Sequence, residues 1–423
     1  MSTISATTQP ASVGRSFRQV WLITGGHALT HWYPATFYLL LPLIGKELGL
    51  SYSQIGLVMT SQYIAGAIAN IPGGMLVDNV GRKGFLMALS LFWIGFPYLL
   101  MSFTHSYWMM LLCVTMVGVG NNLWHPTAIP TLGKLYPDRK GLVLSLHGMG
   151  GNVGEALAPL AIGTLLAALT WREIVVLNVI PGVVMGILIL LFLGAIRLSP
   201  KKTNAETQAL EEGDHERRAL SQYFRDFGQL LRNRSLILLC TSSAFRSMTQ
   251  NALLTFLPVF LAYEMGYSPL WVGVCMFALQ TAGFIASPIS GHLSDRMGRR
   301  QILITSMAMT AVVLGFMAFA GRSPIFVFFV ALLGFFLYAI RPVLQAWLLE
   351  TTPKNMGGTG IGMLFGIQAL GSAVAPLVGG LIADAYGLLA TFYFLAGTIV
   401  VANFFIFFMP AGRADGGAAS KPA

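Results

Sequence analysis

Residues 74–86 read GMLVDNVGRKGFL, and residues 291–303 read GHLSDRMGRRQIL. Several identical pairs stand 217 residues apart in these two stretches, among them Asp78 and Asp295, Gly81 and Gly298, and Arg82 and Arg299. The same offset joins further pairs outside them: Gly49 and Gly266, Gly56 and Gly273, and Pro159 and Pro376. Self-similarity at a long fixed spacing indicates a duplicated structural unit. The chain is therefore predicted to consist of two like halves.

Long apolar segments surround both stretches. Hydrophobic residues make up 55% of the 423 residues and charged residues only 10%, and the mean hydropathy is +0.69. A helix needs about 20 mostly apolar residues to cross a bilayer. Twelve such runs occur, at 19–44, 53–77, 83–103, 107–132, 141–168, 174–196, 235–262, 269–294, 301–320, 324–349, 358–383 and 388–409. We therefore predict an all-α membrane protein with twelve transmembrane helices in two parallel six-helix bundles.

The formal charge of +10 reflects topology rather than a nucleic-acid partner. If both termini are cytoplasmic, 21 of the 26 Lys and Arg residues fall in cytoplasmic segments. This asymmetry follows the positive-inside rule. We expect a monomer in the lipid bilayer of the cell (inner) membrane, multi-pass, with both termini cytoplasmic and no bound nucleic acid.

One long hydrophilic segment divides the halves. Within it, Leu220, Phe224, Phe227 and Leu231 recur at helical spacing among basic residues, which predicts an amphipathic helix on the membrane surface. A solvated linker is the alternative. The expected organisation is an N-terminal tail at 1–18, a first bundle at 19–196, a cytoplasmic linker at 197–234, a second bundle at 235–409 and a C-terminal tail at 410–423.

The doubled pattern G-x-x-x-D-x-x-G-R-[KR] resembles the signature loop of the major facilitator superfamily. The resemblance covers essentially the whole chain. It implies alternating access, with the first, fourth, seventh and tenth helices lining a central cavity. Within that superfamily, HALTHWY (27–33), WHP (124–126) and GGNVGEALAPL (150–160) resemble the fosmidomycin-resistance type of efflux protein, which differs from this chain in carrying Asp in place of His31 and Glu in place of Thr127.

The chemistry of the repeated loop predicts a gate latch. A carboxylate at a helix end, followed by basic residues, can accept charge-assisted hydrogen bonds from guanidinium groups, and glycine permits a tight turn. Arg139 is the expected partner of Asp78, and Glu350 is expected to take that place in the second half. Anchoring of helix ends in the headgroups is the alternative. The expected gating residues are Asp78, Gly81, Arg82, Arg139, Asp295, Gly298 and Arg299.

Ionisable side chains inside a membrane are costly and by default mark a pathway or a site. On the four helices named above, a basic group or imidazole stands four residues from a second polar group, so each pair shares one helix face. Proline follows His125 and Arg341, and we therefore expect NNLWHPTAIP (121–130) to bend the fourth helix. These pairs are the expected substrate-binding residues: His27 and His31, Asn121 and His125, Arg246 and Gln250, and Arg341 and Gln345.

Two fixed guanidinium charges, Arg246 and Arg341, have no mid-span carboxylate on these helices. Because arginine holds carboxylate and phosphate groups through two hydrogen bonds, the cargo is expected to be anionic. Glu155, His31 and His27 are the candidates for proton coupling, since burial and neighbours can move their titration toward neutral pH. Structural pairing within the membrane is the alternative for each of these groups.

Two further patterns bear on function. GEALAPLAIG (154–163) and GSAVAPLVGG (371–380) resemble the Gly-Pro motif of proton-driven antiporters, which favours export, whereas GMGGNVG (148–154) indicates close helix packing. HALTH (27–31) has the spacing of a metal-binding pair, but few further ligands remain, so neither a metal nor a cofactor is expected. The prediction is a secondary active transporter and not an enzyme: proton-coupled export of a small anionic or amphipathic compound. The alternatives are an uptake symporter for an organic anion and, more distantly, an integral membrane metalloenzyme or receptor.

Overall fold

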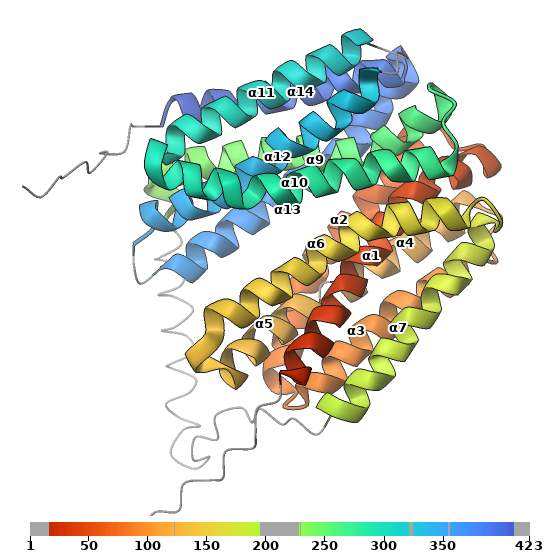
Figure 1. Cartoon of the computed structure of the whole chain (residues 1–423), viewed down its shortest axis with the longest axis vertical. Coiled ribbons are helices and arrows are strands. Elements are labelled where there is room, and N and C mark those ends of the chain that lie inside the picture. Colours follow the sequence, from red (N-terminus) through yellow and green to blue (C-terminus); the bar gives the residue numbers. More distant parts are fainter. Residues whose placement is uncertain are drawn as a thin grey trace, which may run out of the picture.

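The computed structural model describes residues 17–121, 123–194, 228, 230–320, 325–353 and 356–409 (Figure 1). Nearly all of them are helical. The long helices of the first half are α1 (Arg18–Glu47), α2 (Tyr52–Asn79), α3 (Lys83–Met101), α4 (Tyr107–Asn121), α5 (Trp124–Leu135), α6 (Lys140–Leu165) and α7 (Trp171–Leu193), with a short 3-10 helix η1 (Pro137–Arg139). Those of the second half are α9 (Arg234–Tyr263), α10 (Pro269–Met297), α11 (Arg299–Ala320), α12 (Ile325–Thr351), α13 (Gly357–Tyr386) and α14 (Leu388–Phe407).

The predicted fold class is confirmed. Each predicted span corresponds to one helix except the fourth, which comprises two: α4 ends at Asn121 and α5 begins at Trp124. The bend expected in NNLWHPTAIP is therefore a break. By length and apolar composition alone, seven described helices can cross a membrane: α3, α7, α10, α11, α12, α13 and α14. Helices α4 and α5 are too short, with 15 and 12 residues, and α1, α2, α6 and α9 are also not among the seven.

The helices form two bundles. In the first, α1 packs on α6, α3 on α7 and α2 on α4; in the second, α10 packs on α12, α11 on α14 and α9 on α13. The bundles meet along two seams, α2 with α13 and α6 with α10. Figure 1 shows the first bundle in red to yellow below the second in green to blue. They converge at the right and diverge toward the left, where the described chain begins and ends.

Glycines explain how closely the two seams approach. A Cβ added to Gly56 of α2 would lie 2.1 Å from the carbonyl oxygen of Pro376 on α13. At the equivalent place, a Cβ on Gly273 of α10 would lie 2.3 Å from the carbonyl oxygen of Pro159 on α6. Real Cβ contacts of this length do not occur, so both positions require glycine for this packing. The repeated pairs of the sequence are thus contacts between the halves.

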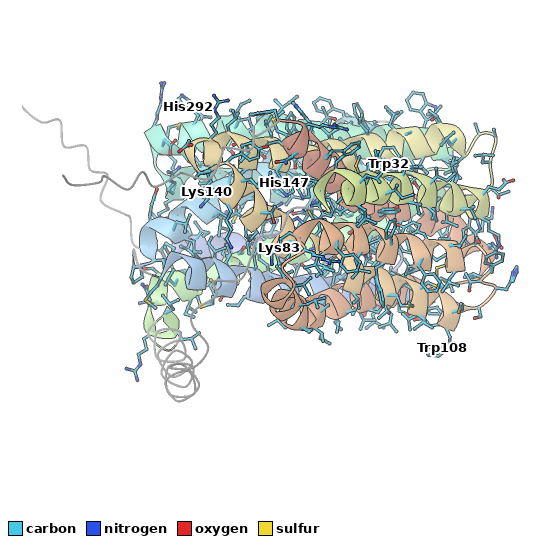
Figure 2. All side chains as sticks on the ribbon, turned by 90° about the horizontal axis from the view of Figure 1, so that it is seen from below. Trp32, Lys83, Trp108, Lys140, His147 and His292 are labelled. Carbon is cyan, nitrogen blue, oxygen red and sulfur yellow. The ribbon has the colours of Figure 1, made fainter. Side chains whose placement is uncertain are left out.

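Hydrogen bonds reinforce the converging end. The Asp384 carboxylate accepts from the backbone N–H groups of Tyr52 and Ser53, at 2.8 and 2.9 Å, where α2 begins. The Tyr263 hydroxyl of α9 donates to the carbonyl oxygen of Pro42 on α1, at 2.6 Å. Figure 2 places Trp108 at this end of the molecule, with Lys140 and His292 at the other. We call these the closed end and the terminal end.

The interhalf linker and its expected amphipathic helix fall largely on 195–227, outside the described residues. The two tails, except residues 17 and 18, also lie outside them.

Candidate functional site

A cavity of about 330 Å³ lies between the bundles, on the terminal side of the glycine contacts. It receives side chains from both halves of the chain. Three predicted residues line it: His31, Glu155 and Gln250. Seven further polar residues line it that the sequence reasoning did not select: Tyr38, Gln62, Tyr63, Asn251, Gln280, Gln368 and Ser372.

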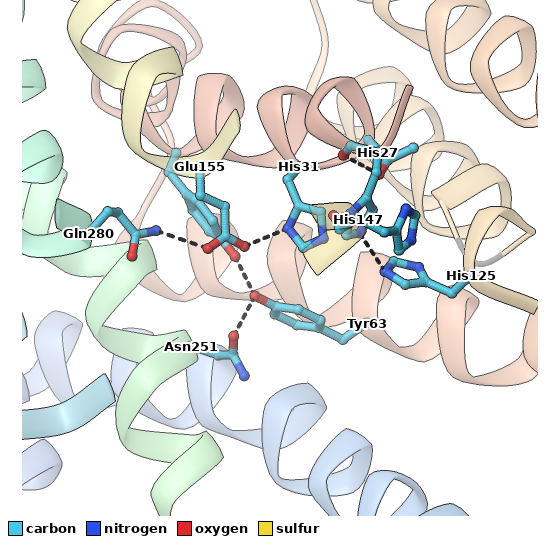
Figure 3. Close-up of polar contacts among 10 residues, drawn as sticks. His27, His31, Tyr63, His125, His147, Glu155, Asn251 and Gln280 are labelled. Carbon is cyan, nitrogen blue, oxygen red and sulfur yellow. Dashed lines mark hydrogen bonds and ion pairs between the residues drawn. The ribbon is translucent and has the colours of Figure 1, made fainter. Parts of the chain in front are cut away.

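A contact between His31 and Glu155 forms one wall of the cavity. The His31 Nδ1 lies 2.7 Å from a Glu155 carboxylate oxygen, and the two side chains are 27% and 32% exposed. The Gln280 amide, on α10 of the other bundle, donates to the second oxygen of Glu155 at 3.5 Å (Figure 3). Glu155 is therefore contacted from both halves.

Behind His31 stands a cluster of three more imidazoles (Figure 3). His27 Nδ1 lies 2.6 Å from the backbone carbonyl of His147, and His27 Nε2 lies 3.1 Å from His125 Nε2. The His27 and His147 rings stack at 3.9 Å between centroids. A Cβ on Gly151 would lie 2.8 Å from the His27 ring, so glycine makes room for the cluster. This agrees with the packing interpretation of GMGGNVG.

A chain of uncharged groups crosses the cavity between the bundles. The hydroxyls of Tyr38 and Tyr63 are 2.5 Å apart, and Tyr63 donates to the Asn251 side-chain oxygen at 3.0 Å. The Asn251 amide then donates to the Ser372 hydroxyl at 2.7 Å. These residues belong to α1, α2, α9 and α13. The contacts join the halves without using charge.

The two arginines occupy different environments. Arg246 is 3% exposed and donates to the side-chain oxygen of Gln250, while its Nε has no hydrogen-bond partner. Arg341 is exposed on α12, within electrostatic range of Arg246 and Glu155. Among the described residues, no ion pair joins either guanidinium to a carboxylate.

Five predicted substrate residues are not in the cavity lining: the two arginines described above, and His27, His125 and Gln345. His27 is buried behind His31, and His125 is half-buried on α5, directly after the helix break. Gln345 is half-buried on α12 and does not line the cavity. The side chain of Asn121 lies outside the described residues.

In the second half, the loop arginine contacts two carboxylates. Arg299 contacts the Asp295 carboxylate at 2.5 Å and the Glu350 carboxylate at 2.9 Å. Gly298 has φ +93°, a left-handed conformation in which glycine is favoured. All of these residues belong to the second bundle, so the contact joins α10 and α11 to α12.

The first-half loop is built differently. The Asp78 side chain lies outside the described residues, and Arg82 and Arg139 are exposed at the terminal end. Gly81, unlike Gly298, does not have a left-handed φ. Instead, the Lys83 ammonium donates back to the carbonyl oxygen of Val77 and closes the turn.

Comparisons with known proteins agree with this geometry. The family described as the Major Facilitator Superfamily matches residues 20–291 and 239–422. A hexuronate transporter of Bacillus subtilis (strain 168) is 25% identical over 378 residues, which cover 85% of this chain and 86% of that protein. A probable sulfoacetate transporter of Cupriavidus necator is 26% identical over 376 residues, 85% of each chain. A bacterial homolog of the human lysosomal transporter Spinster, solved in an inward-facing and unoccupied conformation, shares the fold with a TM-score of 0.80 at 16% identity, over 94% of this chain and 98% of that one.

Proposed function

The chain belongs to the Major Facilitator Superfamily, as a multi-pass membrane transporter and not an enzyme, and from that premise we propose that it exports a small organic anion in exchange for protons. The single observation that carries the anion assignment is Arg246. Its guanidinium is 3% exposed, donates a hydrogen bond to the cavity-lining Gln250, and has an unpartnered Nε. Burying an unpaired arginine at mid-membrane costs about 2.5–3.5 kcal/mol on insertion scales. A bound carboxylate, sulfonate or phosphonate offsets that cost through charge-assisted hydrogen bonds.

The relatives support the same substrate class. One is named for hexuronate and one for sulfoacetate, both organic anions. In this chain the anionic group would bind Arg246, with Arg341 adding long-range attraction. The lining amides of Gln62, Gln280 and Gln368 offer both donors and acceptors to the neutral part of the same molecule.

We place proton coupling at His31 and Glu155. Protonating the carboxylate removes its charge and weakens the contact with His31 Nδ1. Glu155 also lies at the seam with α10, through Gln280. A proton gained or lost there changes the electrostatics of the cavity and a contact between the bundles in a single step. Buried His27, whose Nδ1 donates to a backbone carbonyl, is the supporting member of this relay.

We infer the direction of transport from the expected topology and from a sequence motif. With both termini placed in the cytoplasm, the closed end would face the outside and the anion would be loaded from the cytoplasm. The Gly-Pro motifs at 154–163 and 371–380 form the seams, since their prolines contact Gly273 and Gly56. Their resemblance to antiporter motifs favours exchange of anion against proton.

Two vesicle orientations test the proposal. Everted membrane vesicles, acidified inside by respiration, should accumulate labelled glucuronate, while energised right-side-out vesicles should not. Glucose is the matched neutral compound and should compete poorly. Accumulation only in right-side-out vesicles would establish the uptake symporter instead. Equal competition by glucose and glucuronate would refute the anion assignment.

A further inference from the structure

We propose that His27, His31 and His125 bind one divalent transition-metal cation of the Zn²⁺ class, which ties α1 to α5. One ring nitrogen from each histidine lies within 4.8 Å of the corresponding nitrogens of the other two. Imidazole nitrogen is a preferred ligand of Zn²⁺, Cu²⁺ and Ni²⁺. The proposal concerns a site beside the cavity and does not depend on the identity or direction of the cargo.

The pair of His27 and His125 already has nearly the spacing that a metal requires. Their Nε2 atoms are 3.1 Å apart. Two nitrogens bound tetrahedrally to Zn²⁺ at about 2.0–2.1 Å stand about 3.3 Å apart. Because the His147 carbonyl can only accept, His27 Nδ1 donates to it. In neutral His27 the lone pair is therefore on Nε2, directed at His125.

His31 is oriented in the same manner by a carboxylate. Its Nδ1 is 2.7 Å from Glu155 and donates to it, which leaves Nε2 as the free nitrogen. Metal-binding histidines almost always donate their other ring N–H to a carboxylate or a backbone carbonyl. Two of the three histidines have this second contact, each with a partner on α6. The cluster is thus prearranged for a metal.

The surroundings allow a cation at this place. Gly151 leaves the space that a Cβ would take from the rings of His27 and His31. Arg341 acts unfavourably on a cation near His125, but the Glu155 carboxylate lies on the other side of His31 and offsets that charge. Three protein ligands leave a fourth position for water, as in open zinc sites. A metal here would hold α5 against α1 across the break between α4 and α5.

Metal binding can be measured on the purified full chain in lipid nanodiscs. In competition with a chromophoric chelator, the wild-type protein should bind one Zn²⁺ per chain. His27→Ala and His125→Ala should each lower the affinity at least tenfold, and Glu155→Gln should lower it about tenfold by releasing His31. His292→Ala and His105→Ala remove exposed imidazoles outside the cluster and should bind as the wild type does.

Spectroscopy and thermal unfolding complete the test. Co²⁺ should give the visible absorption of a tetrahedral site in the wild-type protein and lose it in His125→Ala. Zn²⁺ should raise the unfolding temperature of the wild-type protein but not of that variant. The proposal is overturned if the wild type binds less than half an equivalent, or if His292→Ala weakens binding as much as His125→Ala does. If His125→Ala does not fold, His31→Asn with unchanged zinc affinity would overturn it equally. None of these outcomes depends on whether glucuronate is transported.

Discussion

Arg246 and Gln250 stand one helical turn apart on α9, and their hydrogen bond orients the guanidinium beside the cavity. The sequence identified both residues because an arginine in an apolar span is costly. It did not identify Tyr63, Asn251 or Gln280, which contact the same cavity. Burying an uncharged amide or hydroxyl in a membrane helix costs little free energy, so such residues cannot be told from structural ones by sequence. Residues four apart share one helix face. A search of the sequence for an amide side chain four residues from a hydroxyl side chain would have found Gln368 and Ser372 on α13.

At Arg246 we expect a strong dependence of anion binding on the guanidinium. Arg246→Ala should weaken glucuronate binding about 10- to 100-fold, since hydrogen bonds to charged groups contribute about 1.5–3 kcal/mol. Arg246→Lys keeps the charge but not the planar fork, so its loss should be smaller. Arg232→Ala removes an exposed guanidinium and serves as the control. Equal affinity of Arg246→Ala and wild type, by calorimetry, would make Arg246 structural.

At Glu155 we expect loss of coupling without loss of exchange. Glu155→Gln cannot release a proton, so proteoliposomes carrying it should not concentrate substrate under a pH gradient. Counterflow exchange of labelled for unlabelled substrate needs no net proton movement and should remain within about threefold of wild type. His31→Ala should behave alike, because it removes the partner of the same carboxylate. Gradient-driven accumulation in both variants would place the coupling site elsewhere.

At the scale of the helix, the sequence predicted the spans closely and their irregularities only partly. The fourth span contains His125-Pro126 and was expected to bend, yet it separates into α4 and α5. Arg341-Pro342, at the matching place in the second half, leaves α12 continuous. The sequences differ at the matching positions, with Asn121 and Asn122 in the first half and Leu337 and Tyr338 in the second, and asparagine has a lower helix propensity than leucine.

The seam between α2 and α13 gives a prediction at this scale. Gly56→Ala places a methyl group where the Pro376 carbonyl oxygen stands, 2.1 Å away. The helices must separate to accept it, so the closed end cannot close fully and transport should fall at least tenfold. Gly148→Ala is the matched control, because a Cβ there meets nothing within 4 Å. Similar transport rates in the two variants would show that this seam need not close during the cycle.

For the whole molecule, the 217-residue offset predicted two like bundles but could not reveal how they meet. The repeated glycines and prolines turned out to be the contacts themselves, because Gly56 touches Pro376 and Gly273 touches Pro159. A sequence read one helix at a time contains no information on which faces oppose each other. The cavity volume and the histidine cluster also required the three-dimensional arrangement.

Cysteine labelling can test the conformational state of the molecule and its orientation in the membrane. The three native cysteines, Cys113, Cys240 and Cys275, are buried, so background reaction should be low. Ser372→Cys lines the cavity and should react with a membrane-impermeant maleimide in everted vesicles at least tenfold faster than in right-side-out vesicles. Trp108→Cys, 72% exposed at the closed end, should show the opposite preference. Equal labelling of Ser372→Cys from both sides would contradict both the closed state and the proposed topology.

At the closed end, a carboxylate holds one of the two seams and not the other. Asp384 binds the first backbone N–H groups of α2, whereas the position 217 residues earlier is Ala167, which has no carboxylate to offer. The start of α10 accordingly lacks a side-chain cap, and its first residue is Pro269. The two seams have the same glycine contacts, but only the α2–α13 seam is also held by a carboxylate that binds the start of a helix, so we expect it to be the stronger. We infer that separation is sequential: the α6–α10 seam parts first, and the α2–α13 seam acts as the hinge about which the bundles swing.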